Sequence, residues 1–142
     1  MSRGFTLIEL IIVICIIILL TALFWPVGAA YFQREILNKT EQQLIWSLKL
    51  VRANAINQKN NSSFGIYIKD NRMILFQGES YAQRDASNDI IYDIPSSVKI
   101  SGSEIIIFAA NTGLVDNPGL ISLQTNSTIK EIKINELGVI DY

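Results

Sequence analysis

The spacing of charged residues divides the chain into two parts. From Leu10 to Phe32 there are 23 consecutive positions without a charged side chain, whereas charges recur every few residues after Gln33. As a helix rising about 1.5 Å per residue, the uncharged run extends roughly 35 Å, enough to cross the ~30 Å hydrocarbon core of a bilayer. β-Branched residues fill much of the run and weaken helices in water, but in lipid a helix satisfies its own backbone polar groups. The pattern predicts a membrane-spanning helix within residues 5–32.

The helical pattern continues beyond Gln33 but becomes amphipathic. Its apolar positions recur at intervals of three, four or seven residues and so share one helical face: Leu37, Leu44, Leu48, Val51 and Ala55. Glu35 and Lys39 are spaced to form an ion pair on the exposed face. The polar run 57–63 ends the helix. We expect one continuous helix from about Phe5 to Ile56, with a second half that must bury its apolar stripe.

Short apolar runs after residue 63 predict the sheet that covers this stripe. Runs 64–68 and 73–76 flank Asp70 and Asn71, a pair typical of tight turns, and predict a β-hairpin. Run 104–108 is the most apolar, so we expect its strand to be the most central. Further strands are expected at residues 90–94, 98–100, 120–123, 129–134 and 139–141.

These elements indicate an α+β fold in which a long N-terminal helix packs on antiparallel sheets. The expected organisation is a head of residues 33–142, made of a helical part (33–58) and a β region (64–142). Within run 129–134, Ile132 and Ile134 alternate with Glu131 and Lys133, which predicts one solvated face. Since the helical stripe is buried against the head's own sheet, we expect no large exposed apolar patch on the head.

Glu9 is the most unusual residue of the apolar half, because it is ionisable and surrounded by Leu, Ile and Phe. An unpaired charge in the middle of a membrane helix costs on the order of 3 kcal/mol, and less at the headgroups. Glu9 therefore either lies at the headgroups without a function or has a positive partner. Cleavage between Gly4 and Phe5 would supply one, because the new α-amino group of Phe5 lies one helical turn away.

A removed secretory signal is the alternative interpretation of this N-terminus. Such a signal places a basic region before a short apolar run and a small-residue cleavage site after it. Here Arg3 is the sole basic residue before the run, the run is long for that purpose, and residues 28–30 are a poor cleavage site. These features favour a retained membrane helix.

The segment from Arg3 to Leu10, RGFTLIEL, followed by a long apolar helix, resembles the N-terminus of type IV pilins and type II secretion pseudopilins. The resemblance implies that residues 1–4 are a leader, removed by prepilin peptidase after Gly4, and that Phe5 is then N-methylated. It further implies that Glu9 pairs with the N-terminus of a neighbouring subunit during filament assembly. Pro26 stands where many family members carry a helix-kinking proline.

The same resemblance implies a location and a set of partners. The protein would span the bacterial inner membrane once, with its head outside, and then enter a periplasmic or cell-surface filament. Its partners would be other pilin or pseudopilin subunits, the prepilin peptidase and the assembly platform in the membrane. Charge alone does not favour this orientation, because Arg3 precedes the helix while Arg34 and Lys39 follow it.

Shorter motifs in the head resemble minor pseudopilins of the GspH/FimT type. They are the helix end at residues 48–56, the run 110–113 after an apolar strand that ends in Phe108, and the runs 119–123, 132–135 and 138–140. This resemblance narrows the expected role to that of a minor filament subunit. The machine, whether pilus, type II secretion or competence apparatus, is left open.

Composition argues against enzyme chemistry. The chain has no histidine, no glycine-rich phosphate loop and a single cysteine, Cys15, which lies inside the apolar run. We therefore expect neither an enzyme nor a cofactor. Major pseudopilins hold calcium in a head loop, but the acidic run from Asp85 to Asp89 has two carboxylates and no glycine, so a solvated loop is the better interpretation.

Nucleic acid is not favoured as a partner. The formal net charge is −1, so the chain lacks a basic field. Some relatives with this head bind DNA through basic residues after the last glycine, but here Gly138 is followed by VIDY, which carries an acid and no base. The expected function is that of a filament subunit. The alternatives are a single-pass membrane-anchored adhesin or receptor, and a DNA-uptake minor pilin.

Overall fold

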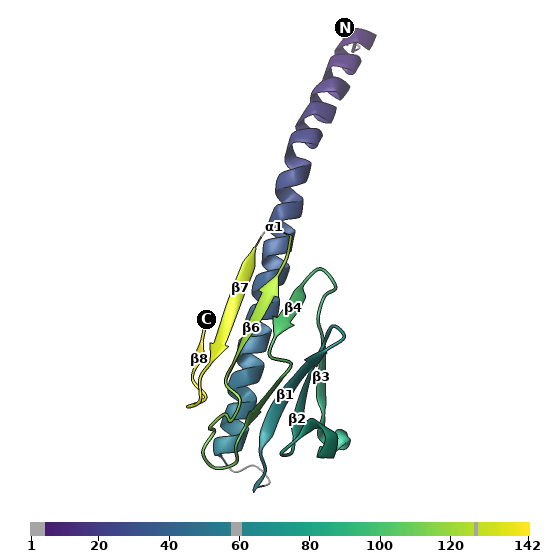
Figure 1. Cartoon of the computed structure of the whole chain (residues 1–142). Helices are drawn as coiled ribbons and strands as arrows, with labels where there is room; N and C mark the ends of the chain where they lie inside the picture. Colours follow the sequence, from purple (N-terminus) through teal and green to yellow (C-terminus); the bar gives the residue numbers. More distant parts are fainter. Residues whose placement is uncertain (1–4, 58–60, 127) are drawn as a thin grey trace.

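The computed structural model describes residues 5–57, 61–126 and 128–142, apart from the side chains of residues 23–27 and 29. Helix α1 (Leu7–Ile56) is one long helix, and its first half extends away from the rest of the molecule (Figure 1). Its second half packs against two antiparallel sheets. The predicted α+β class and the continuous helix are confirmed, with the helix starting at Leu7.

The strands form two four-stranded sheets. The first has the order β3-β2-β1-β5, and its strands are β1 (Phe64–Lys69), β2 (Arg72–Gln77), β3 (Ile90–Asp93) and β5 (Ile105–Phe108). The second has the order β4-β6-β7-β8, and its strands are β4 (Lys99–Gly102), β6 (Gly119–Gln124), β7 (Ile129–Ile134) and β8 (Ile140–Asp141). Two short 3₁₀-helices, η2 (Tyr81–Gln83) and η3 (Ala86–Asn88), lie between β2 and β3.

The predicted hairpin is confirmed as β1–β2. Lys69 pairs with Arg72, so Asp70 and Asn71 alone form the turn. Both have positive φ, 51° and 58°, as the two-residue turn that matches strand twist requires. Asp and Asn adopt this backbone conformation more readily than most residues, which is why the pair signals the turn in the sequence.

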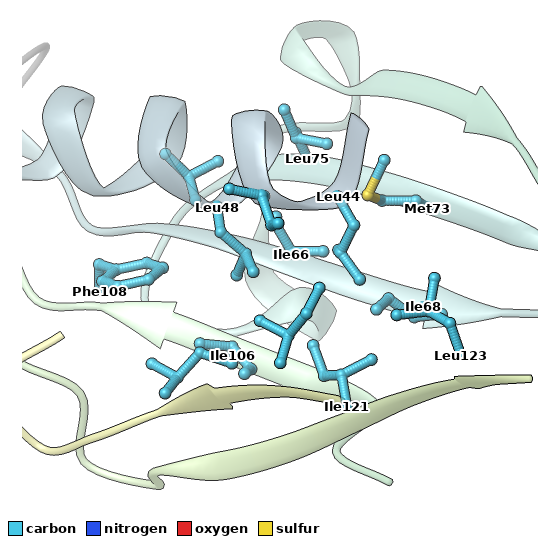
Figure 2. Packing of buried hydrophobic residues seen from close by; sticks show 14 of the residues in the cluster. Leu44, Leu48, Ile66, Ile68, Met73, Leu75, Ile106, Phe108, Ile121 and Leu123 are labelled. Carbon is cyan, nitrogen blue, oxygen red and sulfur yellow. The ribbon is translucent and has the colours of Figure 1, made fainter. Parts of the chain in front are cut away.

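The core lies where the second half of α1 meets both sheets. All five residues of the predicted helical stripe are at most 1% exposed. Figure 2 shows Leu44 and Leu48 among Ile66 and Ile106 of the first sheet and Ile121 of the second. Burying each such aliphatic side chain contributes about 1.5–3 kcal/mol relative to leaving it exposed. The amphipathic helix therefore has its apolar face satisfied within the chain.

The expectation that run 104–108 is the most central strand is wrong. As β5 it forms one end of the first sheet. Its apolar character has two other causes: Ile106 and Phe108 point into the core, and the strand lies at the junction of the sheets, where Phe108 bridges to Val115. An edge strand beside a second sheet is buried enough to need an apolar sequence.

The outer face of the first sheet carries a row of apolar side chains. Strand register places Ile91, Ile74, Tyr67 and Ile105 in one row across the outer face of the first sheet. Ile91 is 53% exposed and Ile105 is 39% exposed, while the two central residues are half-buried. Alternate residues of a strand face opposite sides of its sheet, so this row lies on the face turned away from α1.

Within the described residues, no helix contains a stretch that is both long and apolar enough to cross a bilayer. Part of the predicted span, the side chains of residues 23–27 and 29, lies outside the description. The membrane span therefore stays a prediction.

Candidate functional site

The N-terminal end of α1 is capped by Thr6. The Thr6 Oγ1 accepts a hydrogen bond from the Glu9 backbone N–H at 3.4 Å, and the Thr6 carbonyl accepts one from the Leu10 N–H at 3.3 Å. The sequence Thr-Leu-Ile-Glu has the spacing of a capping box, with Glu at the third helical position. Thr6 was not predicted as the helix N-cap, although a Glu three residues after a Thr is typical of one. Thr6 starts the helix so that Glu9 falls in its first turn.

Glu9 lies where the helix dipole favours a negative charge. Its side chain is exposed, and among the described residues the ion pairs are Glu35–Lys39, Arg84–Asp89 and Glu41–Lys130, which leaves Glu9 in none of them. Gly4 lies outside the described residues, and Phe5 is 82% exposed. The predicted pairing of Glu9 with a Phe5 amine stays a prediction.

The helical surface around Glu9 is apolar on every side. Each large hydrophobic residue from Phe5 to Leu20 is at least 44% exposed, and Cys15 is a free, exposed thiol. The Thr21 hydroxyl donates to the carbonyls of Ile17 and Ile18 at 3.0 and 2.9 Å, so even this polar group is satisfied locally. Such a surface suits an apolar environment that also supplies one cation for Glu9.

Pro26 lies inside α1, which continues through this position. Its side chain is outside the described residues, so the predicted kink is untested.

Three of the head motifs, residues 48–56, 110–113 and 138–140, meet at the C-terminal end of α1. The Asn111 N–H donates to the Ala55 carbonyl at 2.9 Å, and an Arg52 guanidinium nitrogen donates to the Leu137 carbonyl at 3.2 Å. Gly138 has φ 70°, and a Cβ there would lie 2.3 Å from the Gly113 carbonyl oxygen and 3.0 Å from the Arg52 Nε. These residues fasten the helix end to the loops at residues 109–115 and 135–138. Their role in this structure is to position the helix.

The acidic loop considered for calcium has partners of its own. The Asp85 carboxylate accepts hydrogen bonds from the Ser87 hydroxyl at 2.6 Å, the Ser87 N–H at 3.0 Å and the Asn88 amide at 3.1 Å. The Ser87 hydroxyl and N–H hold the pKa of Asp85 below its ordinary value. Among the described residues, no three Cys, Asp or Glu side chains gather as a metal would require.

Arg84 supplies the cation of this loop. Its Nε donates to Asp89 at 2.8 Å, its Nη1 donates to the Tyr81 carbonyl at 2.8 Å, and its guanidinium lies 3.7 Å from the Tyr81 ring centroid. The hydrogen bond to Asp89 raises the pKa of Arg84. Residues 85–88 are exposed, as expected for a solvated loop, whereas the Asp89 side chain is only 7% exposed because it pairs with Arg84.

The C-terminal residues lie against the exposed face of α1. The Lys49 Nζ is 3.4 Å from the Tyr142 hydroxyl and 5.0 Å from the centroid of its ring. Asp141 belongs to β8, which pairs with β7. The tail itself carries no basic residue, but the structure places Lys49 beside Tyr142 and Lys133 opposite Asp141.

Comparison with known proteins identifies the fold but not a family. No family model matches the sequence, and no curated protein sequence matches it. A structure of the minor pseudopilin EpsH from the type II secretion system of Vibrio cholerae matches with a TM-score of 0.56 and 13% identity, covering 73% of this chain and 93% of that chain. A crystal structure of the same pseudopilin matches with a TM-score of 0.56 and 12% identity, covering 75% and 92%. The chain therefore has the fold of a pseudopilin, a long N-terminal helix with antiparallel sheets.

Proposed function

We propose that the protein is a minor structural subunit, without enzymatic activity, of a type IV pilus-like or type II secretion pseudopilus filament. The observation that carries the proposal is the apolar half of α1, exposed on every side and carrying Glu9 in its first turn. A helix of this kind needs an apolar environment outside its own head, and its single acid needs a cation. The pseudopilin fold of the rest of the chain is consistent with that role.

The membrane holds the protein before assembly. Residues 5–32 span the bacterial inner membrane once with the head outside, and prepilin peptidase removes residues 1–4 and methylates Phe5. The assembly platform then transfers the subunit into a periplasmic or cell-surface filament, where Glu9 meets the N-terminal amine of a neighbouring subunit. Supporting this sequence of events are the RGFTLIEL motif and the Thr6 cap, which places Glu9 in the first helical turn.

A GspH/FimT-type subunit is the narrower proposal. Two facts support it: the helix end at residues 48–56 and the glycines at 113 and 138 meet at one place, and the fold matches that of a minor pseudopilin. A family motif spread along the sequence is expected to gather in space if its residues share a structural task.

Processing provides a direct test. We expect membrane-extracted protein to begin at Phe5 and to carry an N-methyl group, as measured by intact-mass and N-terminal peptide analysis. Gly4→Leu should leave the leader attached, while Ser2→Ala, as a matched control, should be cut normally. A wild-type product that starts at Met1, or after Ala30, would contradict the proposal.

The same experiment separates a filament subunit from a membrane-anchored adhesin or receptor, whereas a competence subunit is distinguished by DNA binding. A single-pass adhesin or receptor uses its helix only as an anchor and has no need of cleavage at Gly4 or of an acid at Glu9. A competence subunit would be cut in the same way but would bind DNA, which the acidic tail after Gly138 does not favour.

A further inference from the structure

The four edges of the two sheets differ in how they are protected from another strand. β5 is covered at its end, where Phe108 bridges to Val115, a residue outside both sheets. β4 carries Lys99 and Gly102, and β8 is two residues long and contains Asp141. In natural proteins, charged residues, a short strand or a covering segment prevent an edge strand from pairing with another chain. Strand β3 has neither a charged residue nor a glycine at Ile90, Ile91 and Tyr92, and its one charged residue is Asp93 at the end of the strand.

The backbone of β3 presents hydrogen-bonding groups to its free side. Antiparallel partners alternate between hydrogen-bonded and non-hydrogen-bonded pairs. The Ile94 N–H donates to the Asn71 carbonyl at 2.7 Å, and the register places Tyr92 opposite Met73. Tyr92 and Ile90 are therefore the residues bonded to β2, so Ile91 and Asp93 direct their N–H and C=O groups away from it.

Apolar side chains and a cavity lie on both faces of this free side. Ile91, 53% exposed, continues the apolar row of the outer face, and Ile90, 46% exposed, lies on the face toward α1. A cavity of about 120 Å³ separates α1 from the start of β3, and its lining includes Leu50, Asn54, Leu75 and Ile90. A strand added beyond β3 would direct alternate side chains toward this cavity and toward the outer row.

The charge around β3 indicates which kind of strand could pair with its free edge. Residues 79–93 carry four carboxylates and the Arg84 guanidinium, a net charge of −3. Arg84 is engaged with Asp89, and Arg72 of β2 lies opposite Asp93. With Arg72 included, residues 72–93 keep a net charge of −2, and Glu79 and Asp85 are the carboxylates without a basic partner opposite them. A second copy would bring the same negative segment against its equivalent, whereas a basic segment would be attracted.

We propose that the free edge of β3 binds an extended segment of a different protein chain, with apolar residues at alternate positions and basic residues at its flanks. Backbone hydrogen bonds to Ile91 and Asp93 hold the segment. Its apolar residues cover Ile91 on one face and enter the cavity beside Ile90 on the other. This inference rests on the sheet edge and is independent of the filament role.

The test uses the full-length protein in a nonionic detergent and a synthetic probe. The probe is a short peptide with alternating valine and threonine between flanking lysines, and its binding is measured by fluorescence anisotropy and by amide chemical shifts. We expect saturable binding with the largest shifts at Ile91 and Asp93. Alternate amides of an extended peptide point to opposite edges. N-methylation of the amides that face β3 should abolish binding, whereas N-methylation of the amides that point away from β3 should leave binding intact.

Two variants make the test specific. Ile91→Pro removes an outward N–H without removing a bond to β2, because prolines are tolerated on the solvent side of edge strands. We expect this substitution to lower the affinity for the peptide by roughly tenfold or more, because one hydrogen bond is lost and the proline ring hinders the approach of the peptide. Ile91→Val, the matched control, should bind nearly as the wild type does, and circular dichroism should be the same for both variants.

Three results would overturn the proposal: the absence of saturable binding, shifts that map away from β3, or unchanged binding by a folded Ile91→Pro protein. Equal affinity for a peptide flanked by glutamates would refute the charge argument. Self-association of the full-length protein that Ile91→Pro abolishes would assign the edge to a second copy instead.

Discussion

The two halves of α1 belong to one continuous helix but differ in burial. Between Leu37 and Ala55 a narrow apolar stripe is fully buried under two sheets, while the other faces carry Lys39, Gln42 and Lys49. Between Phe5 and Leu20 the helix is apolar all round, and the large side chains described there are exposed. The second half has completed its packing within the chain. The first half has not, because its large side chains from Phe5 to Leu20 are not covered by the described part of the chain.

The largest expected effect of a single substitution lies in the buried half. Leu48→Ala removes a fully buried side chain and should destabilise the head by about 3 kcal/mol through lost burial and a residual cavity. Leu19→Ala, the same substitution in the exposed half, should leave the free energy of unfolding of the head unchanged. Denaturant titration of the full chain in detergent, followed by tyrosine and tryptophan fluorescence, measures both. Equal effects would contradict the division of α1 into two halves.

A pair of glycines sharpens the comparison. Gly138→Ala puts a Cβ 2.3 Å from the Gly113 carbonyl at a positive φ, and should cost on the order of 2 kcal/mol. Gly28→Ala, in the helix, meets no atom within 4 Å and should be neutral or slightly stabilising, because alanine favours helices. The same denaturant titration applies. If Gly138→Ala were tolerated as well as Gly28→Ala, the loops at residues 109–115 and 135–138 would not fix the helix end.

The smallest expected effect is a pH dependence in the loop at residues 78–89. Since the folded-state pKa of Asp85 lies below its unfolded value, its hydrogen bonds stabilise the head above the unfolded pKa and cease to do so as pH falls through the folded pKa. Asp85→Ala should therefore lower the denaturation midpoint slightly at about pH 7, and this effect should shrink as pH falls through the folded-state pKa of Asp85. A chelator should leave both midpoints unchanged. A chelator effect on the wild type that Asp85→Ala removes would point to a metal in the loop.

The sequence predicted local features well because each has a local cause. The helical stripe follows from the helix period, and the β1–β2 turn follows from the backbone preferences of Asp70 and Asn71. The position of β5 depends on the neighbouring sheet, which a single apolar run does not encode. The exposed row through Ile91 and Ile105 depends on register between strands that are distant in the sequence.

In the candidate site, too, the features with a local cause could be predicted and those that depend on distant segments could not. Glu9 and the cleavage position were predicted from a short motif, and the Thr6 cap was present in that motif but was not recognised. The meeting of Arg52, Gly113 and Gly138 was not predicted, because it brings together segments more than twenty residues apart. The Arg84–Asp89 pair was not predicted, because the calcium argument considered only the carboxylates from Asp85 to Asp89 and Arg84 lies just before them.

The most direct test of the account is the substitution Glu9→Gln. Glutamine keeps the capping-box pattern with Thr6 and removes only the negative charge, so the helix start and the head should be unaffected. Insertion should be unchanged or slightly better, because a charge leaves an apolar helix. The measurement is the amount of the variant in sheared filaments relative to the amount in the membrane, with Gln42→Glu, on the exposed face of the head helix, as a control for a charge change elsewhere. We predict that Glu9→Gln is cut normally and accumulates in the membrane but is lost from filaments; wild-type incorporation would contradict an assembly role for Glu9.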